Sequence, residues 1–450
     1  MPNYRTSNYN VIFEENGKFV FVNLLTSAIA TVDKERYDKI NEIMNEPNKD
    51  WKNEYEKLKN DLVYGGYLVE EDFDELQHLK IMNYSRRFDS SSMNFTIMST
   101  MKCNFDCIYC YESHEGADMD IETAEKVADY ISEVAKNKRS IGIGWFGGEP
   151  LIKFDIMKFI NEKVIKSCQE YKTQFYSSIS TNGYLLSSEK AKLFDELKIH
   201  NVQITLDGPP EYHNKYRPLK GGGPTFNMIL NNIKNLLEST KETKLSLRVN
   251  VGPDNYNAIP ELLDMIEFLP KERMRVYFRW IFQGSDTVKD IHREVMNFRK
   301  KNSFEKLAEF YYFASEKGFE VFLPILSQPI YCEYDTLSAI LIGPKAEIYP
   351  CTVAVNEGSE FGHINNKKIE YDSSKFLSWH KHNAFEDEVC KKCKLLPVCF
   401  GGCRNAIVNE GVRGCPEEAT DIESFARLWY TVKDTERRLK ARFKNESIKI

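Results

Sequence analysis

Apolar runs typical of strands and apolar patterns typical of helices alternate along the chain from Asn94 to about Gln283. The runs are rich in β-branched and aromatic residues, whereas the segments between them carry apolar residues three or four positions apart. The predicted strands are FTIMST, IGIGWF, QFYSSIS, VQITL, LSLRVNV and VYFRWIF, and the predicted helices are 121–136, 154–171, 188–197, 226–237, 258–268 and 304–314. Such alternation predicts parallel strands joined by crossover helices. Six repeats are too few for a closed eight-stranded barrel, so we expect an α/β fold with an open, partial (β/α)6 barrel of the TIM type.

The N-terminal part, before the alternating region, carries a different pattern. YNVIFEE and FVFVNLL, on either side of Gly17, predict a β-hairpin; 33–44 and 51–62 predict two helices, and GGYLVEE predicts a return to strand. This order of elements is typical of a winged helix. Such a module binds either DNA or an extended peptide that adds to an exposed strand edge, and a purely structural cap is a third interpretation. The segment KERYDKINEIMN is not a basic recognition helix, which favours the peptide.

Two further segments complete the outline. Residues 79–92 carry little apolar pattern, and we predict a polar connector between the N-terminal module and the barrel. The segment TDIESFARLWYTVKDTERRLKARF predicts a C-terminal helix with one apolar face, which we expect to dock on the domain before it.

Composition and charge exclude several functions. The chain has 450 residues, of which 42% are hydrophobic and 28% charged, and a formal net charge of -6. This balance offers no electrostatic footprint for nucleic acid. We also expect no association with a membrane, because no segment is long and apolar enough to span a bilayer. The N-terminus MPNYRTSNYN lacks the apolar core of a signal peptide, so we expect a cytoplasmic protein.

Eleven cysteines in a chain without an export signal indicate metal binding rather than disulfides. Cys168 lies in an apolar helical pattern and is interpreted as a buried core residue. Cys103, Cys107 and Cys110 follow the first barrel strand at the spacing C-x3-C-x2-C, which suits three thiolates on one iron-sulfur cube. The fourth iron would then be open to an external ligand. A structural zinc loop is the alternative, but a closed zinc site needs four ligands.

With Tyr109 just before its third thiol, this triplet resembles the signature of the radical S-adenosylmethionine (SAM) enzymes. The resemblance implies a 4Fe-4S cluster, with Cys103, Cys107 and Cys110 as the catalytic ligands, and SAM as cofactor. In that family the reduced cluster cleaves SAM to a 5'-deoxyadenosyl radical, which abstracts hydrogen from the substrate. Tyr109 is by the same resemblance a cofactor-binding residue.

The loop after the second predicted strand carries the sequence Gly147, Gly148, Glu149 and Pro150. Two glycines let the backbone approach a ligand closely, and the Glu149 carboxylate can hold an ammonium group. Alone the motif would predict only a turn. After a strand and a cysteine triplet it resembles the family motif that binds the amino group of SAM.

The third predicted strand ends in SSISTNG, where Ser178 and Ser180 share one face and Asn182 opens a turn. By resemblance this loop reaches the carboxylate or the ribose of SAM, and which serine does so stays open. The fourth strand is followed by LDGPPEYHNKYRP. Similar enzymes usually have His-Asp where this chain has His213 and Asn214, so a role for that acid does not carry over.

Two other residues of the same loop, Asp207 and Arg217, are candidate active-site residues. Equally, the sequence Asp-Gly-Pro that begins at Asp207 predicts a turn and no more.

The seven cysteines beyond residue 330 include the compact pattern C-x2-C-x5-C-x3-C, which is tighter than a zinc ribbon. The pattern resembles the SPASM extension of radical SAM enzymes, which holds two further 4Fe-4S clusters. Family spacing assigns Cys390, Cys393, Cys399 and Cys415 to an outer cluster and Cys332, Cys351 and Cys403 to an inner one. The family usually has glycine where this chain has Ala346, and nearby Gly343 is an alternative source of the turn.

The count of ligands suggests a substrate. The inner cluster has three sulfurs, so its vacant iron could bind a substrate thiolate unless Cys168 or a non-sulfur ligand completes it. The hypothesis is therefore a substrate that contains cysteine.

The whole outline resembles the enzymes that form thioethers in ribosomally made peptides, the sactipeptide, ranthipeptide and six-cysteine maturases. The implied division is a precursor-peptide recognition element at 1–85, a radical SAM barrel at 93–310 and a SPASM domain at 325–450. The implied partners are a precursor peptide, whose leader binds the N-terminal module, and an electron donor of the flavodoxin or ferredoxin type. Neither nucleic acid nor a membrane is expected as a partner.

Alternative functions remain open. An anaerobic sulfatase maturase would carry an aspartate after the inner-cluster cysteine, where this chain has Thr352 after Cys351. Carbon-carbon crosslinking is compatible with the same motifs. A non-catalytic iron-sulfur electron carrier would need neither the open triplet nor the Gly-Gly-Glu-Pro loop, and a DNA-binding regulator would act through the N-terminal module.

Overall fold

The computed structural model describes residues 2–281, 304–323, 329–416 and 421–447. The chain divides into two compact units, which we call the barrel unit (residues 89–322, 336–380 and 435–450) and the cysteine unit (residues 1–88, 323–335 and 381–434). Phe282, predicted to end a strand, and Thr420, predicted to begin a helix, lie outside the described residues. Within those residues, no helix combines the length and the apolar character needed to span a bilayer.

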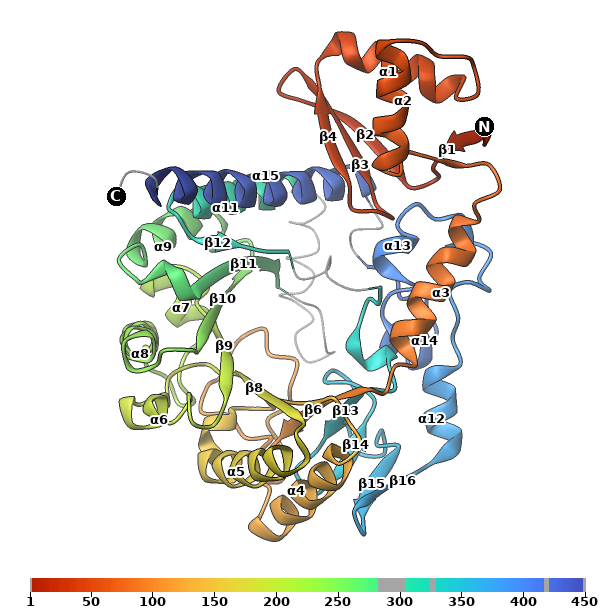
Figure 1. The fold of residues 1–450 in the computed structure, drawn as a ribbon. Helices are drawn as coiled ribbons and strands as arrows, with labels where there is room; N and C mark the ends of the chain where they lie inside the picture. Colours follow the sequence, from red (N-terminus) through yellow and green to blue (C-terminus); the bar gives the residue numbers. More distant parts are fainter. Residues whose placement is uncertain (1, 282–303, 324–328, 417–420, 448–450) are drawn as a thin grey trace. The chain divides into compact units, whose positions relative to one another are not determined.

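The barrel unit contains the predicted alternation of strands and helices, so the partial barrel is confirmed. Six neighbouring strands run parallel in chain order, and Figure 1 shows helices along the outer side of their curved sheet. The strands are β6 (Ser92–Met98), β7 (Ser140–Phe146), β8 (Gln174–Ser180), β9 (Ile199–Thr205), β10 (Lys244–Val251) and β11 (Met274–Trp280). The helices are α4 (Ile121–Ala135), α5 (Phe154–Tyr171), α6 (Ser188–Lys192), α7 (Pro210–Tyr216), α8 (Phe226–Ser239), α9 (Ile259–Met265) and α11 (Phe304–Glu316).

Apolar spacing explains why these helices form and where they face. In α8, the residues Phe226, Ile229, Ile233 and Leu237 recur every three or four positions and are almost completely buried. Two predicted helices end early: α6 stops at Lys192 and α9 at Met265. Beyond α6 the apolar side chains are still buried in a series of turns, because burial on one side does not require continuous helix.

The sheet continues past the six repeats on both sides. The short strand β12 (Glu320–Val321) pairs in parallel with β11, and β13 (Ala339–Ile342) pairs in parallel with β6. Three antiparallel strands follow, β14 (Glu347–Tyr349), β15 (Gly362–Asn365) and β16 (Lys368–Tyr371). In the turn between β13 and β14, Ala346 itself takes a positive φ of 64°, a conformation that costs an alanine about 1–2 kcal/mol.

The N-terminal part of the cysteine unit has the predicted order of elements. The hairpin of β2 (Asn10–Glu15) and β3 (Lys18–Asn23) is extended by β4 (Ile29–Val32), and two helices follow, α1 (Lys34–Asn45) and α2 (Glu54–Tyr64). The predicted return strand is β5 (Leu68–Glu70), which pairs with β1 (Tyr4–Thr6).

Strand β3 contributes to two cores because its side chains alternate between the faces of the sheet. Phe21 packs with Ile40 and Ile43 of α1. On the other face, Val20 and Val22 share a core with residues from the C-terminal part of the same unit, among them Leu395, Leu396, Val398, Cys399, Phe400, Phe425, Ala426 and Trp429. The N-terminal sheet and the C-terminal cysteine region therefore share one apolar core.

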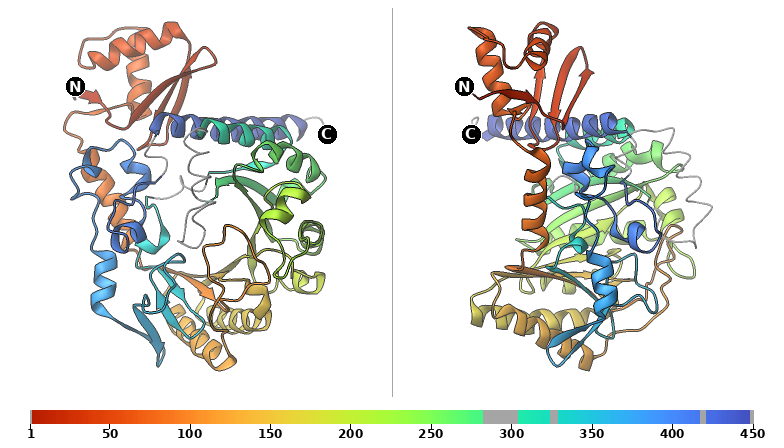
Figure 2. Two further views of the ribbon diagram at one scale, coloured as in Figure 1. Left: turned by 180° about the vertical axis from the view of Figure 1, so that it is seen from behind. Right: turned by 90° about the vertical axis from the view of Figure 1, so that its right-hand side faces the viewer.

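The prediction of a polar connector at 79–92 was wrong, because residues Glu75–Arg87 form helix α3. Its buried stripe is Glu75, Leu79, Asn83 and Arg87, one residue per turn. Three of these four side chains are polar, so no apolar period revealed the helix. The two views of Figure 2 show α3 beside the segment that contains α13 (Leu396–Cys399) and α14 (Arg404–Val408).

Each polar group of this stripe has a partner. The Asn83 side chain donates to the carbonyl of Pro329 at 2.8 Å. The buried carboxylate of Asp335 pairs with Arg87 at 3.1 Å and also with Arg404. These contacts tie the helix to both later segments of the cysteine unit.

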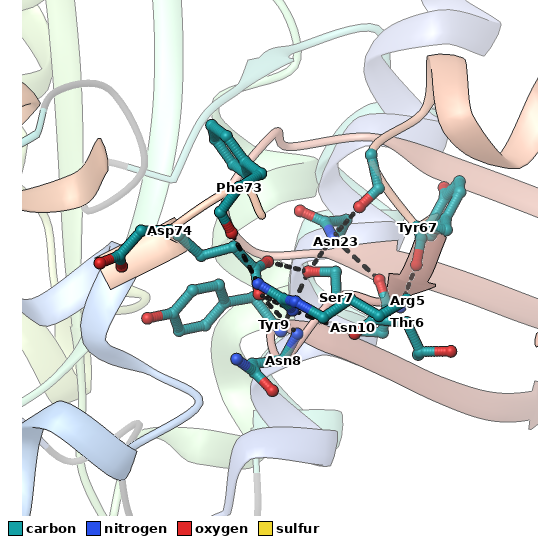
Figure 3. A network of polar contacts seen from close by, with 12 residues as sticks. Arg5, Thr6, Ser7, Asn8, Tyr9, Asn10, Asn23, Tyr67, Phe73 and Asp74 are labelled. Carbon is teal, nitrogen blue, oxygen red and sulfur yellow. Dashed lines mark hydrogen bonds and ion pairs between the residues drawn. The ribbon is translucent and has the colours of Figure 1, made fainter. Parts of the chain in front are cut away.

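Glu75 is the centre of a buried polar network, of which Figure 3 labels Arg5, Ser7, Asn8 and Asn23. Its carboxylate accepts hydrogen bonds from the Ser7 hydroxyl at 2.5 Å, from the Asn8 amide at 3.1 Å and from Arg5 at 2.8 Å. Asn23 extends the network, since its side-chain nitrogen donates to Ser7 at 3.1 Å. The start of α3 is thereby fastened to β1 and β3.

The predicted C-terminal helix is confirmed as α15 (Ile422–Ser447). Cys168 lies in α5 and is 1% exposed, which confirms its interpretation as a buried core residue.

Candidate functional site

The loop with the three cysteines leaves the end of β6 and lies along the segment that follows α7. Backbone hydrogen bonds join the two stretches: Asp106 donates to Pro218 at 3.0 Å, Ile108 donates to Tyr216 at 3.1 Å, and Lys220 donates to Asn104 at 2.8 Å. Within the loop, Phe105 is 1% exposed and anchors it in the core. The loop is thus held by a short antiparallel pairing rather than by its own turns.

The three thiols line one cavity of about 180 Å³ in the barrel unit. All three are free and half-buried. Burial raises the pKa of Cys103 and of Cys110 to about 12. Thiols in such surroundings stay protonated near neutral pH unless a metal displaces their protons, so these groups are suited to metal ligation rather than to nucleophilic chemistry.

The Gly-Gly-Glu-Pro loop packs directly on the cysteine loop. Gly148 donates to the Thr100 carbonyl at 3.1 Å, and Glu149 donates to the Lys102 carbonyl at 2.9 Å. A Cβ on Gly148 would lie 2.3 Å from the Lys102 carbonyl oxygen. Gly147 has a φ of 110°, and a Cβ there would lie 2.5 Å from the Thr100 oxygen. Both glycines line the cavity, and only glycine allows this close approach.

Glu149 is completely buried and is not among the residues that line the cavity. Its carboxylate accepts hydrogen bonds from the Thr181 hydroxyl at 2.7 Å, the Asn182 amide at 2.7 Å and the Leu151 amide at 3.0 Å. Glu149 therefore joins the loops that follow β7 and β8. Pro150 is buried beside it and begins a single helical turn, Pro150–Lys153.

Of the residues predicted at the end of β8, Ser180 and Asn182 line the cavity, whereas Ser178 lies outside the lining. The Asn182 side chain donates to Asn104 at 2.8 Å and approaches the sulfur of Cys103 at 3.9 Å. Ser178 and Ser180 share one face of the strand, as predicted, but only the residue nearer the strand end reaches the cavity.

Tyr109 is the centre of a polar cluster. Its hydroxyl donates to the buried carboxylate of Asp207 and accepts from Arg217 at 2.7 Å and from Asn250 at 3.0 Å. Asp207 is therefore more than part of a turn, because its carboxylate also binds Tyr109 of the cysteine loop. His213 also contributes, because its Nδ1 accepts from the Asp207 amide at 3.2 Å.

The sequence reasoning missed several cavity residues. On β9 these are Gln203 and Thr205, and on β10 they are Arg248 and Asn250. A signal was present, since each pair occupies alternate positions near the end of an otherwise apolar strand. Glu112, just after the cysteine triplet, also lines the cavity, and burial raises its pKa to about 7.

Three observations test whether this cavity fits an iron-sulfur cluster and a polar cofactor. The donor set is three sulfurs, which is the chemistry that iron prefers. The glycine cradle leaves space that a Cβ would fill. Two buried atoms of lining residues, Arg217 Nε and Glu112 Oε2, have no hydrogen-bond partner among the residues that the structure describes. Unfilled hydrogen-bonding capacity around three thiols matches such an occupant.

A second set of thiols lines a cavity of about 330 Å³ in the cysteine unit. The four are those predicted for the outer cluster, Cys390, Cys393, Cys399 and Cys415. Most of the remaining lining is apolar and includes Val389, Leu396, Ile407, Val412 and Pro416. Burial raises the pKa of Cys390 to about 11 and of Cys399 to about 12.

Glycines bring the ends of this cysteine-rich segment together. The Cys403 amide donates to the Gly414 carbonyl at 2.7 Å. A Cβ on Gly402 would lie only 1.7 Å from that same carbonyl oxygen. Cys415 reaches the cavity because the backbone crosses so closely at this point.

The sulfurs predicted for the inner cluster are divided between the units: Cys332 and Cys403 belong to the cysteine unit and Cys351 to the barrel unit. Their joint assignment stays a prediction. Within the part of the chain that the structure describes, no three His, Cys, Asp or Glu side chains are gathered on a single metal ion. The fit of both cavities to clusters rests on their sulfur donors and their linings.

Comparison with known proteins identifies the class. Residues 97–266 match the model of the radical SAM superfamily. This segment begins in β6 and includes the cysteine triplet, the glycine loop and the polar cluster around Tyr109. Over these residues the chain therefore has a radical SAM domain, a type of domain that uses a 4Fe-4S cluster and SAM.

Two relatives are similar to this chain over more of its length than the superfamily model. The chain is 26% identical over 332 residues to the cysteine-type anaerobic sulfatase-maturating enzyme of Clostridium novyi, covering 68% of this chain and 86% of the relative. It also resembles the structure of native anSMEcpe with bound AdoMet and Kp18Cys peptide, with a TM-score of 0.57, 18% identity, and coverage of 76% of this chain and 99% of that one.

A third relative has the same outline over more of the chain. SuiB of Streptococcus suis, solved bound to precursor peptide SuiA, gives a TM-score of 0.50 and 16% identity, and covers 90% of this chain and 96% of that one. At these identities the solved structures bear on the fold: a partial barrel with a small N-terminal β module and a C-terminal cysteine-rich domain.

Proposed function

We propose that this protein is a peptide maturase that joins a cysteine sulfur to a carbon of a ribosomally made precursor, forming a thioether. The observation that carries the proposal is the triplet of half-buried thiols around a cavity whose other walls are polar. Such a site has ligands for one cluster and donors left over for SAM. The four-thiol cavity and the N-terminal module add an electron store and a means of holding a peptide.

The reaction balances without an external oxygen source. When bound and reduced, the cluster supplies the electron that cleaves SAM and so produces the species that removes hydrogen from the substrate. Forming one C–S bond removes one C–H and one S–H hydrogen. One hydrogen leaves with the adenosyl group as 5'-deoxyadenosine, the other leaves as a proton, and one electron passes to an acceptor. We assign that acceptor role to auxiliary clusters at the C-terminal cysteines.

The residues of this chain supply position and polarity. Gly147 and Gly148 let the backbone approach the ligand, and Ser180 and Asn182 offer donors at the end of β8. Glu149 acts indirectly, by holding the two loops in register through three hydrogen bonds. We propose Cys103, Cys107 and Cys110 as the cluster ligands.

The N-terminal sheet offers an edge for the leader of the precursor. Its strand order is β2-β3-β4, so within the described residues β4 has a strand partner on one side only. Residues of β4 are half-buried or exposed, whereas β2 is largely buried. We therefore place leader binding at β4, where an extended peptide would add its main-chain hydrogen bonds.

A second function is favoured by the sequence relative, which is a sulfatase-maturating enzyme at 26% identity. Oxidation of a single side chain would leave no crosslink in the product. Mass analysis separates the two, because thioether formation removes two hydrogens and blocks a thiol from alkylation, while both residues stay in the peptide.

The experiment combines two measurements on anaerobically reconstituted protein. Reduced protein with SAM should release 5'-deoxyadenosine, and co-expression with a small cysteine-containing peptide encoded nearby should yield a product lighter by two hydrogens per crosslink. Protein that carries iron but releases no 5'-deoxyadenosine would contradict the enzymatic proposal. Release without any crosslinked product would contradict the thioether.

A further inference from the structure

Arg217 is a buried cation in the wall of the three-thiol cavity. It stands just after α7, in the segment whose backbone pairs with the cysteine loop. The residue is only 9% exposed, and its guanidinium lies 5.8 Å from the centre of the Phe105 ring. Turning an arginine inward costs several kcal/mol of hydration unless the site compensates the charge. The cavity must therefore supply a reason for this orientation.

The contacts of Arg217 are incomplete within the protein. One terminal nitrogen donates to the Tyr109 hydroxyl at 2.7 Å. Its Nε is buried and has no hydrogen-bond partner within the described part of the chain. Tyr109 cannot take a further donor, because its oxygen already accepts from Arg217 and from Asn250. A donor of the guanidinium is thus left for whatever fills the cavity.

Tyr109 joins a negative and a positive side chain, and the two differ in their access to the cavity. Asp207 accepts from the Tyr109 hydroxyl, is 0% exposed and is absent from the cavity lining, whereas Arg217 belongs to that lining. The two charges are joined through the phenol, and the positive one shares the lining with the three thiols.

We propose that Arg217 is a positioning residue whose positive charge stabilises the reduced form of the cluster bound by Cys103, Cys107 and Cys110. Reduction adds a negative charge to the cluster, and a buried cation nearby offsets it at low dielectric. The same side chain, through Tyr109, holds the cysteine loop against the ends of β9 and β10. This inference rests on the proposed function and adds a residue that tunes how readily the cluster accepts its electron.

The test is a reduction titration of anaerobically reconstituted protein without SAM, followed by electron paramagnetic resonance. Arg217→Gln should make reduction about tenfold less favourable, which is about 59 mV more negative for one electron. Arg217→Lys keeps the charge and should recover more than half of that difference. Arg248→Gln is the matched control, since Arg248 lines the same cavity but donates to Asn250 at 2.7 Å; its effect should be under a third as large.

A variant of opposite sign keeps the proposal testable if Arg217→Gln holds no iron. Asp207→Asn removes the negative end of the pair with little change of shape, and reduction should become more favourable. An unchanged potential in the arginine variant, or a shift of the wrong sign in the aspartate variant, overturns the proposal. So does a result in which only SAM affinity falls, because the cation would then serve the cofactor's carboxylate. A wild-type protein that binds no cluster would instead overturn the proposed function itself.

Discussion

The two thiol-lined cavities differ in number of sulfurs and in the walls around them. In the barrel unit, three thiols share a cavity with serine, asparagine, glutamine, arginine and glutamate side chains. In the cysteine unit, four thiols share a cavity with mostly apolar side chains. Burial raises thiol pKa values to about 12 in both, as at Cys103 and Cys399, so acidity does not distinguish them. The walls do: polar side chains dominate the lining of the three-thiol cavity, whereas only His382, Asp387 and Arg413 stand among the apolar side chains and glycines around the four thiols.

The difference suggests that the two cavities have different tasks, one in the reaction and one in electron storage. A cluster with an open iron needs polar groups that orient a second ligand, whereas a fully ligated cluster needs only sulfur and exclusion of water. We interpret the barrel cavity as the reactive site and the four-cysteine cavity as the storage site. Each of the following predictions acts on one site and leaves the other as reference.

The largest effect is expected from removing a cluster ligand. Cys110→Ala should abolish the signal that responds to SAM and lower 5'-deoxyadenosine release at least a hundredfold, because the remaining two thiols cannot hold a cube. Cys390→Ala should remove iron from the other site alone. Iron content and electron paramagnetic resonance check both, with Cys168→Ala as the reference cysteine variant. Loss of both signals from either single variant would show that the sites are not independent.

The second largest effect is expected where an added methyl group would collide with the backbone of a neighbouring segment. Gly402→Ala puts a Cβ 1.7 Å from the Gly414 oxygen, and Gly148→Ala puts one 2.3 Å from the Lys102 oxygen. Each should cost more than about 2 kcal/mol, because backbone cannot move aside as a side chain can. Urea unfolding measures the shift.

Matched controls exist in both units. Gly411 and Gly222 have positive φ angles but open space around a Cβ. Their alanine variants should therefore lose only about 1–2 kcal/mol. Gly402 also has a positive φ, of 74°. Equal losses at Gly402 and Gly411 would therefore mean that backbone conformation, not close approach, decides.

Glu75→Gln should destabilise the cysteine unit by about 2 kcal/mol, because charged hydrogen bonds from Arg5 and Ser7 are weakened in a buried site. Retention of iron at the four-cysteine cavity should fall on mild heating, since α3 and the cysteine region share one core. The exposed residue Glu71 is the control. Parallel loss of iron from the barrel site would argue against an effect confined to this unit.

A pH effect is expected at the barrel site. Burial lowers the pKa of His213 well below its ordinary 6.5, so the unfolded chain takes up a proton at this residue before the folded one does. The stability contribution is present above pH 6.5 and is lost as the pH falls below it, by about 1.4 kcal/mol per pH unit. His213→Asn should flatten this part of the stability profile. An identical profile in the variant would assign the acid sensitivity elsewhere.

The sequence by itself determined the repeated strands and helices and the three-thiol loop. Local pattern was enough there, because a strand buried on both faces reads as an apolar run and a helix with one apolar stripe reads as apolar residues three or four positions apart. Helix α3 left no such pattern: its buried stripe consists mainly of Glu75, Asn83 and Arg87, and their partners come from distant parts of the chain. Spacing of apolar residues cannot report a helix that is held by polar contacts.

Only the tertiary structure decided which polar residues meet. Three side chains contact the Tyr109 hydroxyl, those of Asp207, Arg217 and Asn250. The first and the last of them are more than thirty residues apart in the sequence. They meet because parallel strands bring their carboxyl ends to one edge of the sheet. In the same way, Glu149 is not part of the cavity lining, and its carboxylate instead links the loop after β7 to the loop after β8. The sequence named the ligand atoms of the site, and the packing of the strands determined their surroundings.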